Sequence, residues 1–174
     1  MDVFEAIRRR RSVRAYTGEP IPGEALDRVL AAGLLAPSSK NIRPLEFVCV
    51  RDAATLAQLA ESKATGAAHV SGAAVAIAVI AQDGAADAWT EDASVALAFM
   101  MLEAEECGLG SCWVQIRLRS DADGNDAQEN VRRILGIPAA YHVEALLALG
   151  VPTKELPPRD WDRTQRDRIH AERF

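Results

Sequence analysis

Apolar residues recur along this chain at two spacings, one typical of helices and the other typical of buried strands. The helical spacing, together with capping residues and Gly or Pro stops, predicts helices over residues 2–10, 24–36, 91–107 and 126–135. Continuous apolar runs rich in β-branched residues predict strands over residues 47–50, 74–80, 111–116 and 143–149. No repeat or linker divides the chain, so we expect a single domain over residues 1–174.

The predicted helix 91–107 is apolar nearly all round, with an uninterrupted apolar stretch from Val95 to Leu102. We expect this helix to be capped near Thr90 and ended by Gly108. A helix without a polar face is buried on every side, which in so small a protein indicates a subunit interface as well as a core. A central core helix in a monomer is the alternative that the sequence leaves open.

Five arginines, Arg8, Arg9, Arg10, Arg11 and Arg14, lie close together in a chain whose net charge is −5. Because their charges repel one another, such a cluster suits a concentrated anion such as a phosphate. A solvated basic helix end is the alternative reading of the same residues. The acidic total charge argues against general nucleic-acid binding, which needs a broader basic face.

The composition argues against several other classes of protein. Hydrophobic residues make up 49% and charged residues 26% of the chain, as in globular proteins. No apolar run is long enough to span a membrane and the acidic start does not resemble a signal peptide, so we expect a cytoplasmic protein without a membrane partner. The three cysteines form no CxxC pair and the three histidines lack metal-ligand spacing, so we expect neither a disulfide framework nor a metal.

Five short motifs, in this order along nearly the whole chain, resemble those of the FMN-dependent nitroreductases. They are Arg10-Arg11-Ser12-Val13-Arg14, Ala36-Pro37-Ser38-Ser39-Lys40-Asn41, Gly108-Leu109-Gly110-Ser111-Cys112-Trp113, Leu135-Gly136-Ile137-Pro138 and Leu149-Gly150-Val151-Pro152. The resemblance implies an α+β fold, in which helices flank a mixed and mostly antiparallel sheet. It also implies an intertwined homodimer with FMN sites at its interface. In such relatives the C-terminal extension reaches over the partner subunit, which would give the polar segment after Thr153 a surface to lie on.

The resemblance further implies which basic residues meet FMN. Arg10 and Ser12 match positions that hold the phosphate or the ribityl chain, and Arg11 is the neighbouring motif position. Arg14 matches a basic position beside the pyrimidine edge, where a positive charge stabilises the reduced flavin. Arg159 matches a late basic position on the phosphate. Lys154, Arg163 and Arg166 in the tail are the competitors of Arg159 for this role. We expect Arg8 and Arg9 to face solvent.

Two further motifs would meet the flavin ring. The first, which in relatives comes from the other subunit, consists of Pro37, Ser38, Ser39 and Asn41. These residues would equally serve as a helix stop. The second, whose backbone runs beside the flavin N5 in relatives and can offer it an N–H donor, consists of Trp113, Val114 and Gln115. Core packing is the alternative role of Trp113.

The chain departs from the family pattern at three places. Arg43-Pro44-Leu45 stands where Gln-Pro-Trp is frequent, so a tryptophan is missing from the pocket. The segment between Asp52 and Ala73 leaves little room for the helical insertion that covers the substrate in larger relatives. Ile116 replaces a glycine, which can alter the local loop.

The resemblance implies an enzyme that moves a hydride from NADH or NADPH to FMN, and then passes electrons to a nitroaromatic, a quinone or a similar acceptor. One pocket would serve both half-reactions, which predicts ping-pong kinetics. No side-chain nucleophile or base is needed, so Cys107 and Cys112 should be dispensable. The alternative is a flavin-binding protein without this turnover, active in storage, sensing or flavin breakdown. The residues do not identify the acceptor or the preferred nucleotide.

Overall fold

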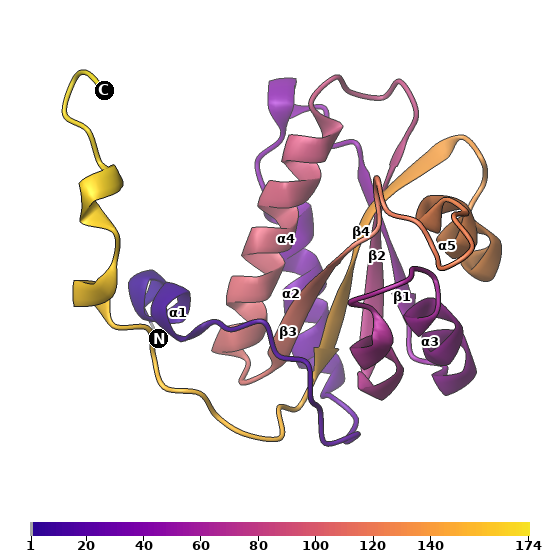
Figure 1. The fold of residues 1–174 in the computed structure, drawn as a ribbon, viewed down its shortest axis with the longest axis horizontal. Helices are drawn as coiled ribbons and strands as arrows, with labels where there is room; N and C mark the ends of the chain where they lie inside the picture. The colour runs from indigo at the N-terminus through magenta and orange to yellow at the C-terminus, as the bar shows by residue number, and fades with distance from the viewer. Residues whose placement is uncertain (1) are drawn as a thin grey trace.

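The computed structural model describes residues 2–174, and at its centre lies a four-stranded sheet with helices on both faces (Figure 1). The strands are β1 (Leu45–Val50), β2 (Val75–Gln82), β3 (Gly110–Gln115) and β4 (Tyr141–Gly150). Their order across the sheet is β1-β2-β4-β3, and each neighbouring pair is antiparallel. A parallel bridge between Ser12 and Ser111 adds the N-terminal segment to the β3 edge. The predicted α+β fold with a mostly antiparallel sheet is therefore confirmed.

Residues 2–174 also form five α-helices and four 3₁₀ turns. The α-helices are α1 (Val3–Arg9), α2 (Gly23–Leu35), α3 (Ala53–Ala60), α4 (Trp89–Glu106) and α5 (Ala127–Leu135). The 3₁₀ turns are η1 (Ser39–Asn41), η2 (Ala68–Gly72), η3 (Trp161–Arg163) and η4 (Arg166–Arg168). Helix α3 and turn η2 were not predicted, and they occupy the segment that had little room for an insertion.

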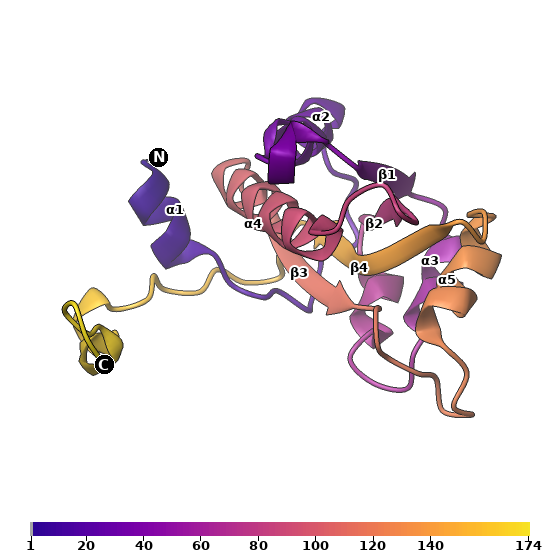
Figure 2. The same ribbon diagram turned by 90° about the horizontal axis from the view of Figure 1, so that it is seen from above.

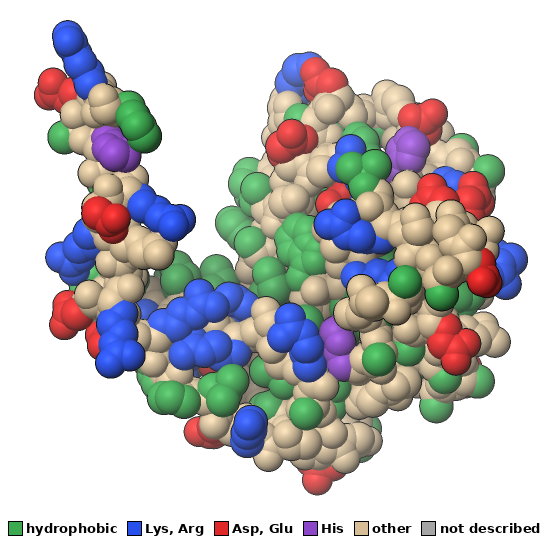
Figure 3. All heavy atoms as spheres, in the orientation of Figure 1, with side chains coloured by type: hydrophobic (Ala, Val, Ile, Leu, Met, Phe, Trp, Pro, Cys, Tyr) green, Lys and Arg blue, Asp and Glu red, His purple; other side chains and the backbone are tan. Residues whose placement is uncertain are grey.

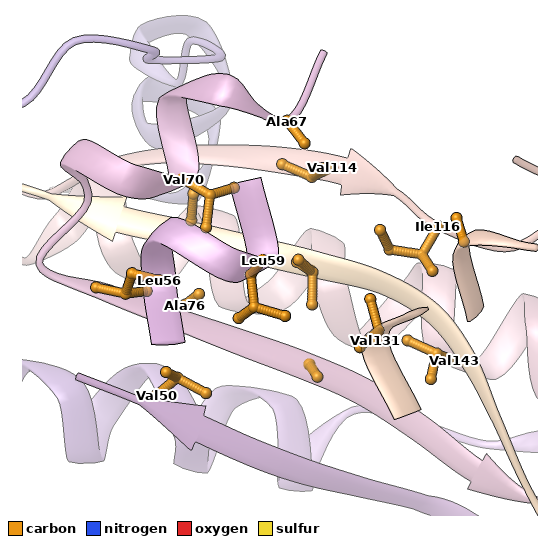
Figure 4. Packing of buried hydrophobic residues seen from close by; sticks show 14 of the residues in the cluster. Val50, Leu56, Leu59, Ala67, Val70, Ala76, Val114, Ile116, Val131 and Val143 are labelled. Carbon is orange, nitrogen blue, oxygen red and sulfur yellow. The ribbon is translucent and has the colours of Figure 1, made fainter. Parts of the chain in front are cut away.

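The helices cover the two faces of the sheet as separate layers (Figure 2). Helices α2 and α4 pack on one face, against the side chains of Val75, Ile77 and Val79. Helices α3 and α5, with η2, pack on the other face, where Leu59 and Val131 belong to the second core (Figure 4). Successive side chains of strand β2 point alternately into the two cores, which explains why both its odd-numbered and its even-numbered residues are apolar.

Helix α4 differs from its prediction in two ways. It begins at Trp89 after Ala88 and no side chain caps it, so the expected cap near Thr90 is wrong. Its inner residues, such as Leu97 and Met100, are fully buried, but Val95 and Phe99 remain 36% and 41% exposed. Within one chain the helix is therefore buried on one side, and burial all round needs a second surface.

The polar C-terminal segment leaves the sheet after β4 and runs beside α1, away from the main body (Figures 1 and 2). Its backbone pairs with α1 where the N–H of Arg159 donates to the carbonyl of Arg8 at 2.9 Å. The rings of Phe4 and Trp161 meet edge to face, with centroids 5.3 Å apart. Figure 3 shows a hollow between this arm and the body, with hydrophobic side chains on its floor and on the α4 side.

Candidate functional site

The segment that carries the arginine motif lies along the outer edge of β3. Its anchor is Val13, whose N–H donates to the carbonyl of Ser111 at 2.9 Å. Gly110 makes this approach possible, because a Cβ atom there would lie only 2.8 Å from a methyl group of Val13. Gly150 plays the same part for the ring of Tyr16, which would lie 2.8 Å from an added Cβ. The two glycines therefore allow this segment to lie close against the sheet, because neither has a Cβ atom in the way.

Three guanidinium groups, of Arg10, Arg11 and Arg159, influence one another at the start of this segment. Burial lowers the pKa of Arg10, and the positive charges of Arg159 and Arg11 lower it further, while Glu105 acts in the opposite direction. Like charges held together in a half-buried place are favourable only when an anion compensates them. Figure 3 shows the Lys and Arg side chains that gather along this part of the molecule. The structure thus brings together two arginines of the motif, Arg10 and Arg11, and the late basic residue Arg159.

The neighbouring arginines have carboxylate partners. Arg8 pairs with Glu5 at 3.0 Å and Arg9 pairs with Glu105 at 3.6 Å. Both side chains are about two-fifths exposed, so they face solvent only in part. Arg14 is exposed and donates to the carbonyl of Ser12 at 3.4 Å.

The tail offers fewer competitors to Arg159 than the sequence suggested. Arg163 pairs with Asp160 at 3.5 Å. The guanidinium of Arg166 lies over the ring of Trp161, 4.7 Å from its centroid. Arg159 is held near Arg10 by its backbone pairing with α1, and this location favours it as the late basic residue.

The backbone of β3 turns alternate residues to the outer edge of the sheet. The carbonyl of Ser111 accepts from Val13, and that of Gln115 accepts from the Lys63 ammonium at 2.9 Å. In an antiparallel strand the N–H and C=O of one residue point to the same side. The N–H groups of Trp113 and Gln115 therefore point to this edge, whereas Val114 pairs with β4 and is fully buried.

The side chains of Trp113 and Gln115 belong to a fixed polar network. The indole N–H of Trp113 donates to Oε1 of Gln115 at 2.8 Å. The amide of Gln115 donates in turn to Oε1 of Glu144 at 2.9 Å, and Glu144 is only 4% exposed. Trp113 also packs against the core beneath α4. Its side chain thus follows the core-packing alternative, while its backbone lies on the edge that the resemblance assigns to the flavin.

Two basic residues at this edge were not predicted from the sequence. Burial lowers the pKa of Lys63, and the charge of Arg119 lowers it further. Burial also lowers the pKa of His69, followed by the charges of Arg14 and Lys63. Lys63 and His69 come from the loop and turn between α3 and β2, where no spacing in the sequence signals proximity to β3. The charges of Arg14 and Lys63 give this edge a positive potential, and His69 lies beside them.

The Pro37–Asn41 motif forms a tight loop after α2. Three of its residues or neighbours have left-handed backbones, with φ of 53° at Lys40, 55° at Asn41 and 53° at Arg43. Such conformations cost about 1–3 kcal/mol each, although Asn tolerates them better than other residues. The N–H of Arg43 donates to the Ser38 hydroxyl oxygen at 2.9 Å. Arg43, which stands at one of the departures from the family pattern, therefore helps to close the loop.

The loop lies far from the arginine motif of the same chain. Ser39 is hydrogen-bonded to Asp92, in the first turns of α4, whereas Arg9 pairs with Glu105, near the end of that helix. At 1.5 Å of rise per residue, the two contact points on α4 are about 20 Å apart. One chain therefore does not bring Pro37, Ser38, Ser39 and Asn41 together with the predicted phosphate and ring-edge residues.

The remaining departure, Ile116, follows β3 and is fully buried in the core beneath α5. Its N–H donates to the carbonyl of Glu144 at 3.1 Å, so this backbone group is engaged inside the sheet. Among residues 2–174, no group of His, Cys, Asp or Glu could hold a metal ion. Within the same residues, no helix is long and apolar enough to cross a membrane.

The arrangement is that of an α+β protein with a sheet between two helical layers and a basic edge, and comparisons with known proteins define its family. The profile described as Nitroreductase family matches residues 7–91 and 63–151. The chain belongs to the nitroreductase family.

Relatives and solved structures agree with this assignment over nearly the whole chain. A Methanothermobacter thermautotrophicus protein, named as a candidate NADH dehydrogenase/NAD(P)H nitroreductase, is 33% identical over 100% of this chain and 88% of its own. An FMN-dependent nitroreductase from Clostridium difficile superposes with a TM-score of 0.95 and 35% identity, covering 98% of this chain and 99% of its own. A candidate nitroreductase from Desulfovibrio desulfuricans, in complex with FMN, has a TM-score of 0.78 and 29% identity, covering 100% and 98%.

Proposed function

We propose that this chain is an FMN-dependent NAD(P)H oxidoreductase of the nitroreductase type. The observation that carries the proposal is the cluster of Arg10, Arg11 and Arg159, three like charges of which one is already partly desolvated. A phosphate dianion compensates such a cluster through charge-assisted hydrogen bonds. The relatives from C. difficile and D. desulfuricans, described as FMN-dependent and in complex with FMN, support this choice of anion.

The residues of the β3 edge fit the other parts of FMN. Arg14, together with the unpredicted Lys63, would place positive charge at the pyrimidine edge, where negative charge develops on reduction. The N–H groups of Trp113 and Gln115 would offer donors to the ring nitrogens, because the β3 edge presents both. When bound, FMN supplies the hydride-accepting and hydride-returning chemistry that no side chain can supply. Ser12, at the start of the segment, would meet the phosphate or the ribityl chain.

The protein would work as a homodimer in which each FMN site takes residues from both chains. The loop at Pro37–Asn41 would approach the arginine motif of the partner, since within one chain about 20 Å of α4 separates them. The surface for such a partner consists of exposed apolar side chains on three helices: Val3, Phe4 and Ile7 of α1, Leu34 and Leu35 of α2, and Val95 and Phe99 of α4. An apolar groove of about 450 Å³ runs between these helices. Exposed apolar side chains gathered on neighbouring helices are typical of a protein–protein interface.

Sedimentation and FMN binding test the dimer together. Phe99→Asp places a charge in the proposed interface, and we expect it to yield a monomer that binds FMN at least tenfold more weakly. Val48→Ala, within one chain's own core, is the control that lowers stability without dissociating the subunits. A monomeric wild-type protein that binds FMN as tightly as its relatives would contradict the shared site.

The experiment for the reaction is an anaerobic absorbance titration of the purified protein with NADH and then with NADPH. We expect flavin bands that bleach with at least one nucleotide and return when a nitroaromatic or a quinone is added. Steady-state rates over both substrates should then give parallel double-reciprocal lines, because one site serves both half-reactions. A yellow protein whose bands persist with both nucleotides would favour flavin binding without turnover. A colourless protein that takes up no FMN would overturn the proposal.

The alternative of flavin binding without turnover has one structural feature in its favour. The segment between Asp52 and Ala73 forms α3 and η2, which pack on the core of the sheet. It therefore adds no helical cover over the proposed site. Bleaching by a nucleotide in the titration above decides between the two functions.

A further inference from the structure

We propose that Asp92 of α4 is a positioning residue that sets the shape of the Pro37–Asn41 loop for the proposed flavin site. The inference rests on the proposed function, in which this loop meets FMN. Asp92 would not touch the flavin itself. It would act through the backbone N–H of Ser39, which donates to its Oδ1 at 2.7 Å.

The environment of Asp92 is unusual for a carboxylate. The residue is only 5% exposed, and its second oxygen, Oδ2, is buried without a hydrogen-bond partner among the described residues. Burying a carboxylate with a single strong hydrogen bond is unfavourable, so stability alone does not explain an aspartate here. The contact that this carboxylate does make joins two segments that are 53 positions apart in the chain.

The loop needs an attachment to another element, such as this hydrogen bond to α4, because its backbone is strained. Lys40, Asn41 and Arg43 all have positive φ values, and none of them is a glycine. Strained conformations of this kind persist only where the surroundings enforce them. The hydrogen bond between Ser38 and Arg43 closes the loop on itself but does not tie it to another element. The ion pair between Lys40 and Asp87 does tie it, but both side chains are about two-thirds or more exposed, which makes this pair weak.

The position of Asp92 on α4 also relates the loop to the proposed dimer surface. Asp92, Val95 and Phe99 follow one another at helical spacing on one stripe of α4. The loop is bonded to this stripe at Asp92, and further along it Val95 and Phe99 are exposed. A loop fixed to α4 at this point is therefore held in a defined position relative to a partner that packs on Val95 and Phe99.

Two substitutions separate the acceptor oxygen from the charge. Asp92→Ala removes the acceptor of the Ser39 N–H, and we expect it to raise the Kd for FMN at least tenfold. Asp92→Asn keeps one acceptor oxygen and should restore the Kd to within threefold of wild type. Asp87→Asn is the matched control, since it removes an exposed acidic partner of the same loop, and its Kd should stay within twofold.

Visible circular dichroism of the bound flavin at saturating FMN is the readout that a general loss of stability would not move. We expect an altered spectrum in Asp92→Ala and wild-type spectra in Asp92→Asn and Asp87→Asn. If Asp92→Ala does not fold, Asp92→Glu replaces it, because its longer side chain keeps the charge but displaces the acceptor. Asp92→Glu should raise the Kd at least threefold and alter the spectrum.

The outcomes distinguish this inference from the proposed function. A wild-type protein that takes up no FMN overturns the proposed function and the inference with it. The inference alone is overturned if the wild-type protein binds FMN and Asp92→Ala leaves the Kd and the spectrum unchanged. Asp92→Glu decides in the same way if Asp92→Ala does not fold. Equal losses in Asp92→Ala and Asp92→Asn would also overturn it, because the acceptor oxygen would then not be the group that matters.

Discussion

Gly110→Ala should weaken FMN binding without touching any residue proposed to contact FMN. A Cβ atom at Gly110 would lie 2.8, 2.9 and 3.1 Å from three side-chain atoms of Val13, whereas ordinary contact begins at 3.4 Å. Close packing leaves no room for the added methyl group, so it would push the Val13 side chain away by about 0.6 Å. The 2.9 Å hydrogen bond of Val13 to Ser111 would lengthen to about 3.5 Å, beyond good geometry. Overpacking of this kind costs about 1–3 kcal/mol of stability.

The displacement passes to the proposed FMN contacts because Ser12 and Arg14 adjoin Val13. A loss of about 1.4 kcal/mol of binding free energy corresponds to a tenfold higher Kd, which is the change we expect. Flavin fluorescence quenching measures the Kd, and urea denaturation measures the free energy of unfolding. Gly72→Ala is the control, since its φ is not left-handed and nothing lies within 4 Å of an added Cβ.

A double-mutant cycle identifies the cause of the effect. Val13→Ala removes two of the three close atoms and leaves the Cβ at 2.9 Å, so it should partly relieve the clash of Gly110→Ala. We expect the two substitutions to be non-additive by about 1 kcal/mol, as for residues in direct contact. Additive effects, or a Gly110→Ala protein with wild-type Kd and stability, would refute the claim that a methyl group at position 110 pushes Val13 away from β3.

Three further results are expected. Replacing both Cys107 and Cys112 by alanine should leave FMN binding and turnover within about twofold, because burial raises the pKa of both thiols and the proposed chemistry uses neither; lost turnover with FMN still bound would contradict the mechanism. Burial lowers the pKa of His69, so the stability that its neutral form supports is complete above about pH 6.5 and lost as the pH falls below it. His69→Gln should make the melting temperature less dependent on pH between about pH 5 and 7. Hydrogen bonds, chiefly from Asn side chains, lower the pKa of Asp121 from 3.8 to about 2, so its contribution is present above pH 3.8 and lost toward pH 2; Asp121→Asn should remove that acid dependence in unfolding titrations.

The elements whose ends carry chemical signals could be predicted from the sequence. Asp2 accepts from the N–H of Glu5 at the start of α1, as its capping spacing predicted. Asp126 caps α5, and Gly136 ends it with a left-handed φ of 66°. Helix α3 was missed although Asp52 caps it through Thr55, so the same signal was present there. Leu56 and Leu59 are at helical spacing, but a helix of eight residues is shorter than the window over which apolar periodicity is recognised.

The composition of the site could be predicted only in part. The motifs identified the arginine segment, the loop after α2 and the β3 edge, because each has a recognisable local sequence. The place of Arg159 depends on two hydrogen bonds with Arg8, across 151 positions of the chain: its N–H donates to the Arg8 carbonyl, and the Arg8 side chain donates to its carbonyl. Lys63 reaches β3 only because α3 and η2 pack on the same face of the sheet. Neither contact has a local signal, since both arise from tertiary packing.

Helix α4 explains why a second copy would complete the site. The loop is attached near its first turn, at Asp92, and the arginine segment lies near its last turn, at Glu105. A two-fold axis perpendicular to α4 reverses the helix, so the loop of one copy would lie beside the arginines of the other. Subunits carrying Arg10→Ala and subunits carrying Asp92→Ala should therefore complement each other when they are unfolded and refolded together.

Statistical pairing gives half heterodimers, and each heterodimer would combine one intact site with one doubly altered site. About a quarter of all sites should thus regain FMN, at a concentration where neither parent homodimer binds it. Separately refolded proteins that are then mixed are the control, since a permanent dimer does not exchange subunits quickly. No recovery in the jointly refolded sample would mean that each site takes both of these residues from a single chain. A site built from a single chain would contradict the proposed shared site, because about 20 Å of α4 separates the loop from the arginine segment within one chain.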